Sequence, residues 1–121
     1  MKNKDLKTTI IDLKKSVEEF VSEREWQKFH NPKSLSMAIA IEASELMEHF
    51  LWDSLEESKE SYKAKKSEIN KEVADILIAT MALCNRLDID IATVVEDKIS
   101  EIKKKYPADA ARGKKDKYTA Y

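Results

Sequence analysis

The chain has 121 residues, of which 37% are charged and 42% are apolar, and its formal net charge is −1. This length corresponds to one domain, and the balanced charge provides no general attraction to nucleic acid or to an anionic membrane. The chain contains only one Gly and two Pro. This scarcity favours helices, because Gly and Pro are the residues that mark turns. We therefore expect a single all-α domain over 1–121, with neither a nucleic acid nor a membrane as partner.

The cysteine content and the N-terminus indicate a cytoplasmic protein. Cys84 is the one cysteine, so no disulfide can form within the chain, and an intracellular location is the simple interpretation. The opening MKNKDLKTT lacks the apolar core of a signal peptide, and no apolar run approaches the roughly 20 residues of a membrane span. We expect Cys84, which lies between Leu83 and Leu87, to be a small core residue.

Apolar side chains that recur every three or four residues predict four main helices. The first is expected over about 5–27 and the second over about 35–52. Ser34 is the predicted N-cap of the second helix, because Pro32 disfavours helix at the residue before it. The second helix is apolar around most of its circumference, so we expect it to be the central one.

The second half of the chain contains a polar link and two further helices. Ser54 and Glu57 fit a capping box that begins a short solvated helix. The third main helix is expected over about 66–87, and Asp90 is placed to cap the fourth. The tail, 107–121, is basic and aperiodic, and we expect it to be flexible or to cross to another subunit. Together these elements predict an all-α, four-helix-bundle-like fold.

Two acidic pairs lie on the apolar faces of the second and third helices. At about 100° per residue, Glu42 and Glu45 fall within about 60° of each other, and Glu72 and Asp75 repeat the arrangement. Burying four carboxylates side by side is unfavourable unless positive charge compensates them. Mg²⁺ or Mn²⁺, which prefer hard oxygen ligands, would remove this conflict. Because Mg²⁺ shares its remaining positions with substrate phosphates, the pattern points to phosphate chemistry.

Three other interpretations of the acidic pairs stay open on this evidence. A single E-x-x-E is usually a solvated helix face. A buried ion-pair network would need inward Lys or Arg, which the middle of neither helix supplies. A di-iron bundle would need Glu-x-x-His pairs, and His49, on the same face as Glu42 and Glu45, is misplaced for that role. We expect His49 to be a partly buried histidine with its hydrogen bonds satisfied.

The spacing of the acidic pairs resembles a known family. E-x-x-E at 42–45, followed after 26 residues by E-x-x-D at 72–75, is similar to the motif of the all-α MazG-like nucleotide pyrophosphohydrolases. Further stretches resemble the dCTP-pyrophosphatase branch of that family: REWQKFHNPKSLSMAIAIEASELMEHFLW (24–52), KEVADILIATMAL (71–83), Lys98 to Pro107, and the late RGKKDKYT.

The resemblance implies an activity and its cofactor. It implies Mg²⁺-dependent hydrolysis of (deoxy)nucleoside triphosphates to monophosphate and pyrophosphate, with Mn²⁺ as a substitute ion. The role would be housecleaning of the nucleotide pool with a pyrimidine, dCTP-like preference. Glu42, Glu45, Glu72 and Asp75 match the family's catalytic metal ligands. The general base would be Glu45 or Glu48.

The resemblance also implies substrate contacts. The matching positions are Trp26, Gln27, Lys28, Phe29, His30, Trp52 and Lys98. From the residues alone, such aromatics can stack a base, but Trp26 and Phe29 can equally plug the end of a bundle. The basic tail either closes over phosphates or is simply solvated; its residues are Arg112, Lys114, Lys115 and Lys117.

Three positions depart from the dCTP branch and bear on base and sugar preference. Val17, Ala79 and Ile102 stand where the branch carries a polar or aromatic substrate contact. The metal ligands are unaffected by these departures.

The family's proteins are dimers or tetramers, and the apolar second helix fits a homo-oligomer, most simply a homotetramer. The alternative to an enzyme is a non-catalytic helical interaction module whose acidic pairs are structural. That alternative predicts a melting temperature that does not depend on Mg²⁺ or nucleotide.

Overall fold

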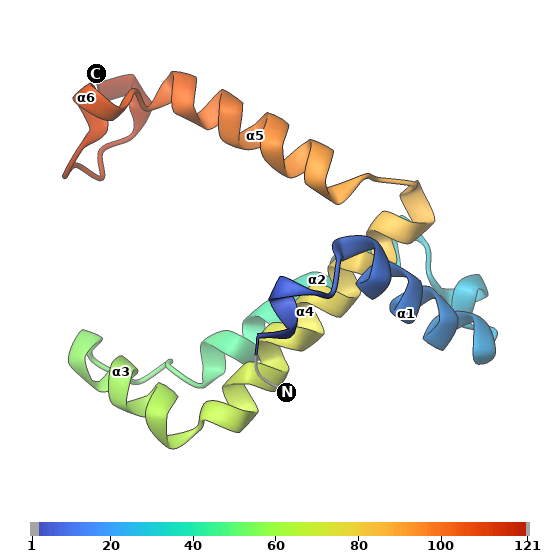
Figure 1. Ribbon diagram of the computed structural model, residues 1–121. Coiled ribbons are helices and arrows are strands. Elements are labelled where there is room, and N and C mark those ends of the chain that lie inside the picture. The colour runs from blue at the N-terminus through green and yellow to red at the C-terminus, as the bar shows by residue number, and fades with distance from the viewer. Residues whose placement is uncertain (1–2, 121) are drawn as a thin grey trace. The chain divides into compact units, whose positions relative to one another are not determined.

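The computed structural model describes residues 3–120, so Met1, Lys2 and Tyr121 of the predicted domain lie outside the description. The helices are α1 (Ile10–Glu23), α2 (Pro32–Glu48), α3 (Leu55–Ala64), α4 (Lys66–Leu87), α5 (Ile91–Lys105) and α6 (Ala108–Ala111), with short 3-10 helices η1 (Lys4–Leu6), η2 (Trp26–Phe29) and η3 (Tyr118–Ala120) (Figure 1). Residues 3–120 contain no strand, which confirms the all-α prediction.

The chain divides into two compact units, Met1–Asp88 and Ile89–Tyr121. The first contains η1 to α4, and the second contains α5, α6 and η3. The single domain over 1–121 stays a prediction. Both acidic pairs belong to the first unit, so the fold of that unit positions the candidate site.

The start of α2 corrects the predicted N-cap. Asn31, not Ser34, caps the helix: its side chain accepts a hydrogen bond of 2.9 Å from the Ser34 backbone N–H. Pro32 occupies the first turn, where proline is tolerated because the N–H that it lacks would have no helical partner. The helix therefore begins three residues earlier than predicted, and it ends at Glu48 rather than near 52.

The remaining helix limits follow local backbone chemistry. The first helix stops at Glu23 rather than near 27, because Glu25 adopts a left-handed conformation with φ of 53°, which a right-handed helix cannot continue through. The capping box of Ser54 and Glu57 is confirmed, as is the cap at Asp90. The third predicted helix matches α4, Lys66–Leu87.

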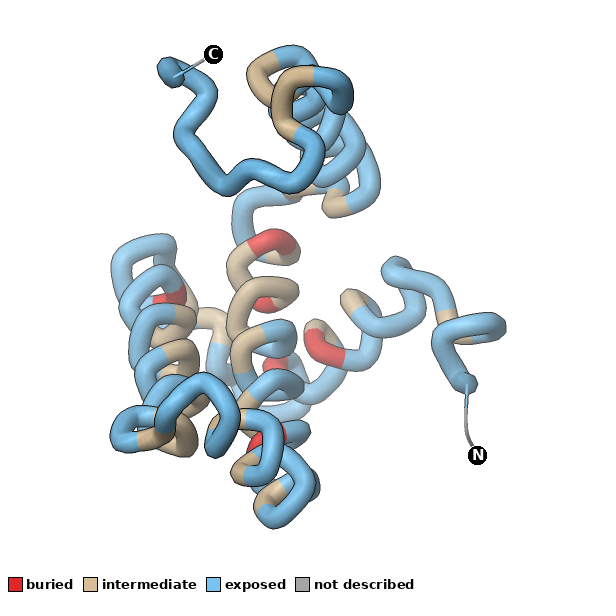
Figure 2. Tube along the Cα trace, turned by 90° about the vertical axis from the view of Figure 1, so that its left-hand side faces the viewer, coloured by how far each residue is buried: buried red, intermediate tan, exposed pale blue. Residues whose placement is uncertain are grey.

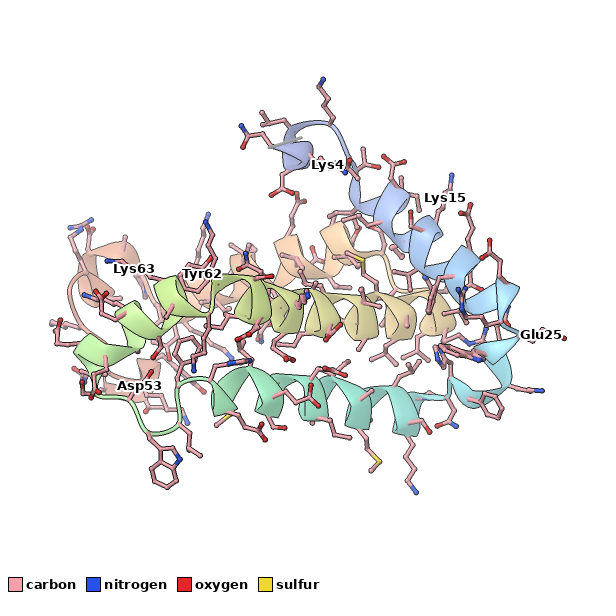
Figure 3. The ribbon with its side chains drawn as sticks, turned by 90° about the horizontal axis from the view of Figure 1, so that it is seen from below. Lys4, Lys15, Glu25, Asp53, Tyr62 and Lys63 are labelled. Carbon is pink, nitrogen blue, oxygen red and sulfur yellow. The ribbon has the colours of Figure 1, made fainter. Side chains whose placement is uncertain are left out.

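The central helix of the first unit is α4 rather than α2. Helix α4 packs against α1, α2 and α3, and it runs antiparallel to α2 (Figures 1 and 3). Its 22 residues are long enough to meet all three neighbours. Helix α2 keeps part of its apolar surface exposed, at Met37, Ile41 and Met47. The expectation that α2 would be central was therefore wrong.

The buried core is small. Among residues 3–120, the buried apolar side chains are Val17, Val21, Leu35, Ile69, Ala82 and Cys84 (Figure 2). The burial of Cys84 confirms its predicted core role. An apolar groove of about 660 Å³ also runs between α1 and α4. We call it the α1–α4 groove; it is lined by Leu13, Ser16, Val17, Phe20, Ala74, Asp75, Leu77, Ile78 and Met81.

Candidate metal centre

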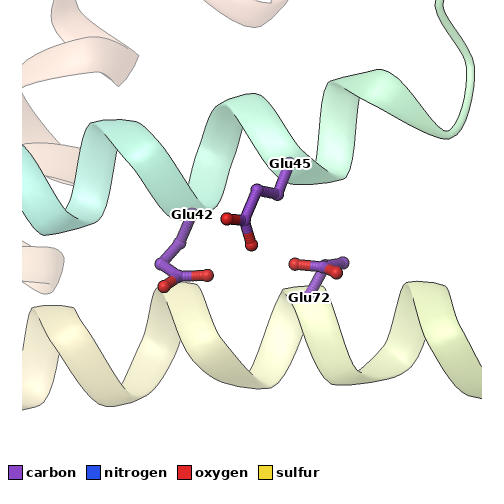
Figure 4. A group of neighbouring side chains, drawn as sticks. All are labelled: Glu42, Glu45 and Glu72. Carbon is purple, nitrogen blue, oxygen red and sulfur yellow. The ribbon is translucent and has the colours of Figure 1, made fainter.

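Three carboxylates meet between α2 and α4. Glu42 and Glu45 extend from α2 toward α4, and Glu72 extends from α4 toward α2 (Figure 4). One oxygen of each lies within 4.8 Å of the others, and all three side chains are partly buried. The spacing of three residues places Glu42 and Glu45 on one side of their helix, and the antiparallel packing brings Glu72 opposite them.

Burial and mutual repulsion perturb two of these carboxylates. The pKa of Glu42 is raised above its ordinary value, first by burial and then by the charge of Glu45. The pKa of Glu72 is also raised, again chiefly by burial and then by the close approach of Glu45. Both shifts mean that the charged form is disfavoured in the folded protein.

Two oxygens in the group have no hydrogen-bond partner among the residues that the structure describes. Within residues 3–120, Oε2 of Glu42 and Oε2 of Glu72 are buried and accept no hydrogen bond. A buried acceptor without a partner is costly, and a charged one is more so. A divalent cation would satisfy both oxygens and lower the repulsion, and carboxylate oxygens are the ligands that Mg²⁺ and Mn²⁺ prefer. The residues present therefore fit such an ion.

Asp75 lies outside this group of three. It is exposed on α4 and lines the α1–α4 groove. Its charge nevertheless contributes to the raised pKa values of Glu42 and Glu72. Its role as a fourth ligand stays a prediction.

His49 lies beside the carboxylates, although the sequence analysis gave it no role in the metal site. Its Nε2 lies 3.7 Å from Oε1 of Glu72, and each of the two side chains is 20% exposed. The expected partial burial is confirmed. The signal was present in the spacing, because His49 follows Glu42 by seven residues and Glu45 by four, which places all three on one helical face.

The predicted substrate contacts between α1 and α2 lie on η2 and just after it. Trp26 packs edge-on against Phe20, with ring centroids 5.6 Å apart, and is 42% exposed. Gln27 Nε2 donates a hydrogen bond of 2.6 Å to Ser22 Oγ. Trp26 therefore rests on α1 while part of its ring stays accessible.

The next residues present both charged and unsatisfied groups. Lys28 Nζ lies 5.3 Å from the centroid of the Phe29 ring. Nδ1 of His30 is buried and has no hydrogen-bond partner within residues 3–120.

The other two predicted substrate contacts lie elsewhere in the chain. Trp52, after α2, is 90% exposed. Lys98 belongs to α5 in the second unit, where its Nζ lies 3.2 Å from Glu101.

The fold and the site together define an all-helical protein in which carboxylates from two antiparallel helices face one another. The sequence profile of the MazG-like family matches residues 37–120, which include all three carboxylates. The chain belongs to the MazG-like family.

The chain is similar to individual members of known name. It is 34% identical over 113 residues to dCTP pyrophosphatase 1 of Rattus norvegicus, and 33% identical over the same length to dCTP pyrophosphatase 1 of Homo sapiens. Each match covers 92% of this chain and 66% of the relative, so the chain spans just under two thirds of the length of these relatives.

A solved structure extends this similarity to the fold. A pyrophosphatase from Archaeoglobus fulgidus superposes with a TM-score of 0.78 at 36% identity, over 81% of this chain and 92% of that one. Within residues 3–120, no helix has the length and apolar character that crossing a membrane requires.

Proposed function

We propose that this protein is a Mg²⁺-dependent nucleoside triphosphate pyrophosphohydrolase. The observation that carries the proposal is the group formed by Glu42, Glu45 and Glu72, in which two buried oxygens have no partner within the described residues. The relatives named dCTP pyrophosphatase 1 support the reaction class.

The proposed reaction breaks one phosphoanhydride bond. The oxygen of a water molecule bonds to the α-phosphorus, the bond from that phosphorus to the α–β bridging oxygen breaks, and the products are monophosphate and pyrophosphate. Glu42, Glu45 and Glu72, with Asp75 as the proposed fourth ligand, would hold Mg²⁺ or Mn²⁺. When bound, such an ion neutralises phosphate charge and lowers the pKa of a bound water. We propose Glu45 or Glu48 as the base that takes the water proton.

The nucleotide is proposed to be a pyrimidine deoxynucleotide such as dCTP. Trp26 presents a part-exposed ring on which a base can stack, and the unpartnered Nδ1 of His30 is available to a polar substrate group. We propose Gln27, Lys28, Phe29, Trp52 and Lys98 as the further substrate contacts. Val17 is a core residue, so at that position the chain uses its side chain for packing.

We also propose that the active form is a homo-oligomer. The α1–α4 groove is apolar, and several large side chains that line it are about half exposed, among them Phe20, Leu77 and Ile78. A contiguous exposed apolar surface of this kind typically marks an interface. A dimer or tetramer of identical chains would cover it.

The test is a product analysis with matched variants. The protein is incubated with Mg²⁺ and each common dNTP and NTP, and the products are separated. We expect monophosphate and pyrophosphate, with pyrimidine deoxynucleotides cleaved fastest. Glu42→Gln should lower kcat about 100-fold or more, because it removes a ligand charge where transition-state charge is stabilised. Glu68→Gln, which changes an exposed glutamate on α4, is the control and should retain activity.

Other outcomes would contradict specific parts of the proposal. Diphosphate and phosphate as products would exclude cleavage between the α- and β-phosphates. Full activity in Glu42→Gln would exclude the metal centre. No turnover with Mg²⁺ or Mn²⁺, together with a melting temperature that neither ion nor nucleotide changes, would favour the non-catalytic interaction module.

A further inference from the structure

We propose that His49 is a positioning residue, which holds the carboxylate of Glu72 so that its second oxygen faces the cation. The inference rests on the proposed function, because it assumes that a divalent ion binds at the three carboxylates. It assigns a role to a side chain outside the acidic motif.

The two oxygens of Glu72 have different surroundings. Oε1 faces Nε2 of His49 at 3.7 Å, whereas Oε2 is buried without a hydrogen-bond partner in the described part of the chain. Oε2 is thus the oxygen left for an ion. Carboxylates that bind metals are themselves commonly held by hydrogen bonds from a second residue. A separation of 3.7 Å is long for a hydrogen bond, and contacts of this kind often tighten only when the ligand binds.

His49 is itself fixed from the other side. It caps the C-terminus of α2, and its backbone carbonyl accepts a hydrogen bond of 3.0 Å from Nζ of Lys65. Lys65 immediately precedes α4, the helix that carries Glu72. The backbone of His49 is therefore anchored between the end of one ligand-bearing helix and the start of the other.

Glu72 is also the member of the group that most needs such support. Glu42 and Glu45 lie one turn apart on the same helix, so their spacing is set by α2. Glu72 comes from the opposite helix. Its carboxyl, whose pKa is raised chiefly by burial, faces Glu45 of α2, which raises that pKa further, and His49 at the end of α2, which lowers it. Losing the contact with His49 would leave the Glu72 side chain free to take other rotamers, and a cation would then have to order it.

The experiment measures Mn²⁺ binding rather than turnover. The full chain is titrated with Mn²⁺ alone, and free Mn²⁺ is followed by electron paramagnetic resonance. His49→Leu removes the N–H donor but keeps an apolar side chain, and His49→Gln restores an N–H at similar reach. His49→Asn carries the same amide on a side chain too short to reach Glu72. Met47→Leu, at an exposed position of α2, is the control.

We expect His49→Leu to weaken Mn²⁺ binding about 10- to 100-fold, as for other residues that hold metal ligands. His49→Gln should recover most of the affinity, His49→Asn should not, and Met47→Leu should bind as the unaltered protein does. If His49→Leu does not fold, as judged by circular dichroism, the difference between the Gln and Asn variants gives the same answer.

The results separate the two proposals. Wild-type affinity in His49→Leu, or equal affinity in the Gln and Asn variants, would overturn the positioning role and leave the metal centre standing. The absence of saturable Mn²⁺ binding in the unaltered protein would overturn the metal centre, and the role of His49 with it.

Discussion

At the scale of single residues, the candidate site holds charges that the folded protein disfavours. Glu42 and Glu72 both have raised pKa values because they are partly buried near Glu45. A carboxyl group with a higher pKa in the folded state binds protons more tightly there than in the unfolded chain. These two groups therefore lower stability progressively as the pH rises from their ordinary pKa of 4.5 through the raised folded values.

We predict that this pH dependence disappears when a cation binds. In EDTA, the contribution of Glu42 and Glu72 should lower the melting temperature as the pH rises above about 4.5. Saturating Mg²⁺ should raise the melting temperature most at neutral pH, because the carboxylates are then fully charged and the ion binds only the native state. Thermal melts at a series of pH values, with and without Mg²⁺, measure both effects.

The matched variant for this experiment is Glu42→Gln. It should melt at a higher temperature than the unaltered protein in EDTA at neutral pH, because it removes one partly buried charge, and it should gain less from Mg²⁺. A lower melting temperature for Glu42→Gln in EDTA would show that the carboxylate is not under repulsion.

The sequence predicted that Glu42, Glu45 and Glu72 meet, but it did not show how each carboxylate is oriented. It also placed Asp75 with them, and that residue lies outside the group. Helical periodicity is enough to place Glu42 and Glu45 on one face, and the apolar run around Glu72 places it inward. The division of the Glu72 oxygens between His49 and an open position depends on side-chain rotamers and on the packing of α2 against α4. Spacing along a single helix carries no such information.

At the scale of elements, short local contacts fix the polar segment between α2 and α4. Asp53, at the bend shown in Figure 3, accepts a hydrogen bond of 2.5 Å from Ser61 Oγ. The hydroxyl of Tyr62 donates to Oδ1 of Asn70 at 3.0 Å. These bonds connect α3 to the preceding loop and to α4. They help to set where α4 begins relative to the end of α2.

We predict that the capping box of α3 makes a measurable contribution to stability. Ser54 Oγ accepts a hydrogen bond from the Glu57 N–H at 3.2 Å, and the Glu57 carboxylate accepts one from the Ser54 N–H at 3.1 Å. Ser54→Ala should cost about 1 kcal/mol, which corresponds to a fall in melting temperature of about 4 °C. Ser67→Ala, at an exposed position of α4, is the control, and an equal loss in both variants would contradict the prediction.

The helix boundaries show where the sequence alone was enough to predict the structure and where it was not. The Ser54 and Asp90 caps were predictable, because in each case the capping side chain bonds within three residues of itself. The start of α2 differs from the prediction, because Pro32, which disfavours helix at the residue before it, is itself well suited to the first turn of a helix. The centrality of α4 depends on tertiary packing, which the apolar content of α2 alone could not reveal.

At the scale of the whole molecule, the proposed oligomer has a definite test at the α1–α4 groove. Leu77 lines this groove and is 52% exposed. Leu77→Lys should reduce the molar mass measured by light scattering to that of a single chain, because burying an unpaired charge in an apolar interface is unfavourable. Ser67→Lys adds the same charge at an exposed position of the same helix and should keep the mass of the unaltered protein.

A single-chain mass for the unaltered protein at micromolar concentration would exclude the homo-oligomer. An oligomer that survives Leu77→Lys would mean that the chains associate through another surface.

The position of the carboxylates between α2 and α4 has a consequence for the lifetime of the protein. The contact between these two helices is the most extensive in the first unit. The carboxylates of Glu42, Glu45 and Glu72 repel one another within this contact. Without an ion, the two helices should separate more often, and proteases cleave such opened states in proportion to their population. We expect limited proteolysis of the purified protein to slow as Mg²⁺ is added. The supply of Mg²⁺ would then set how long the chain survives as well as how fast it works.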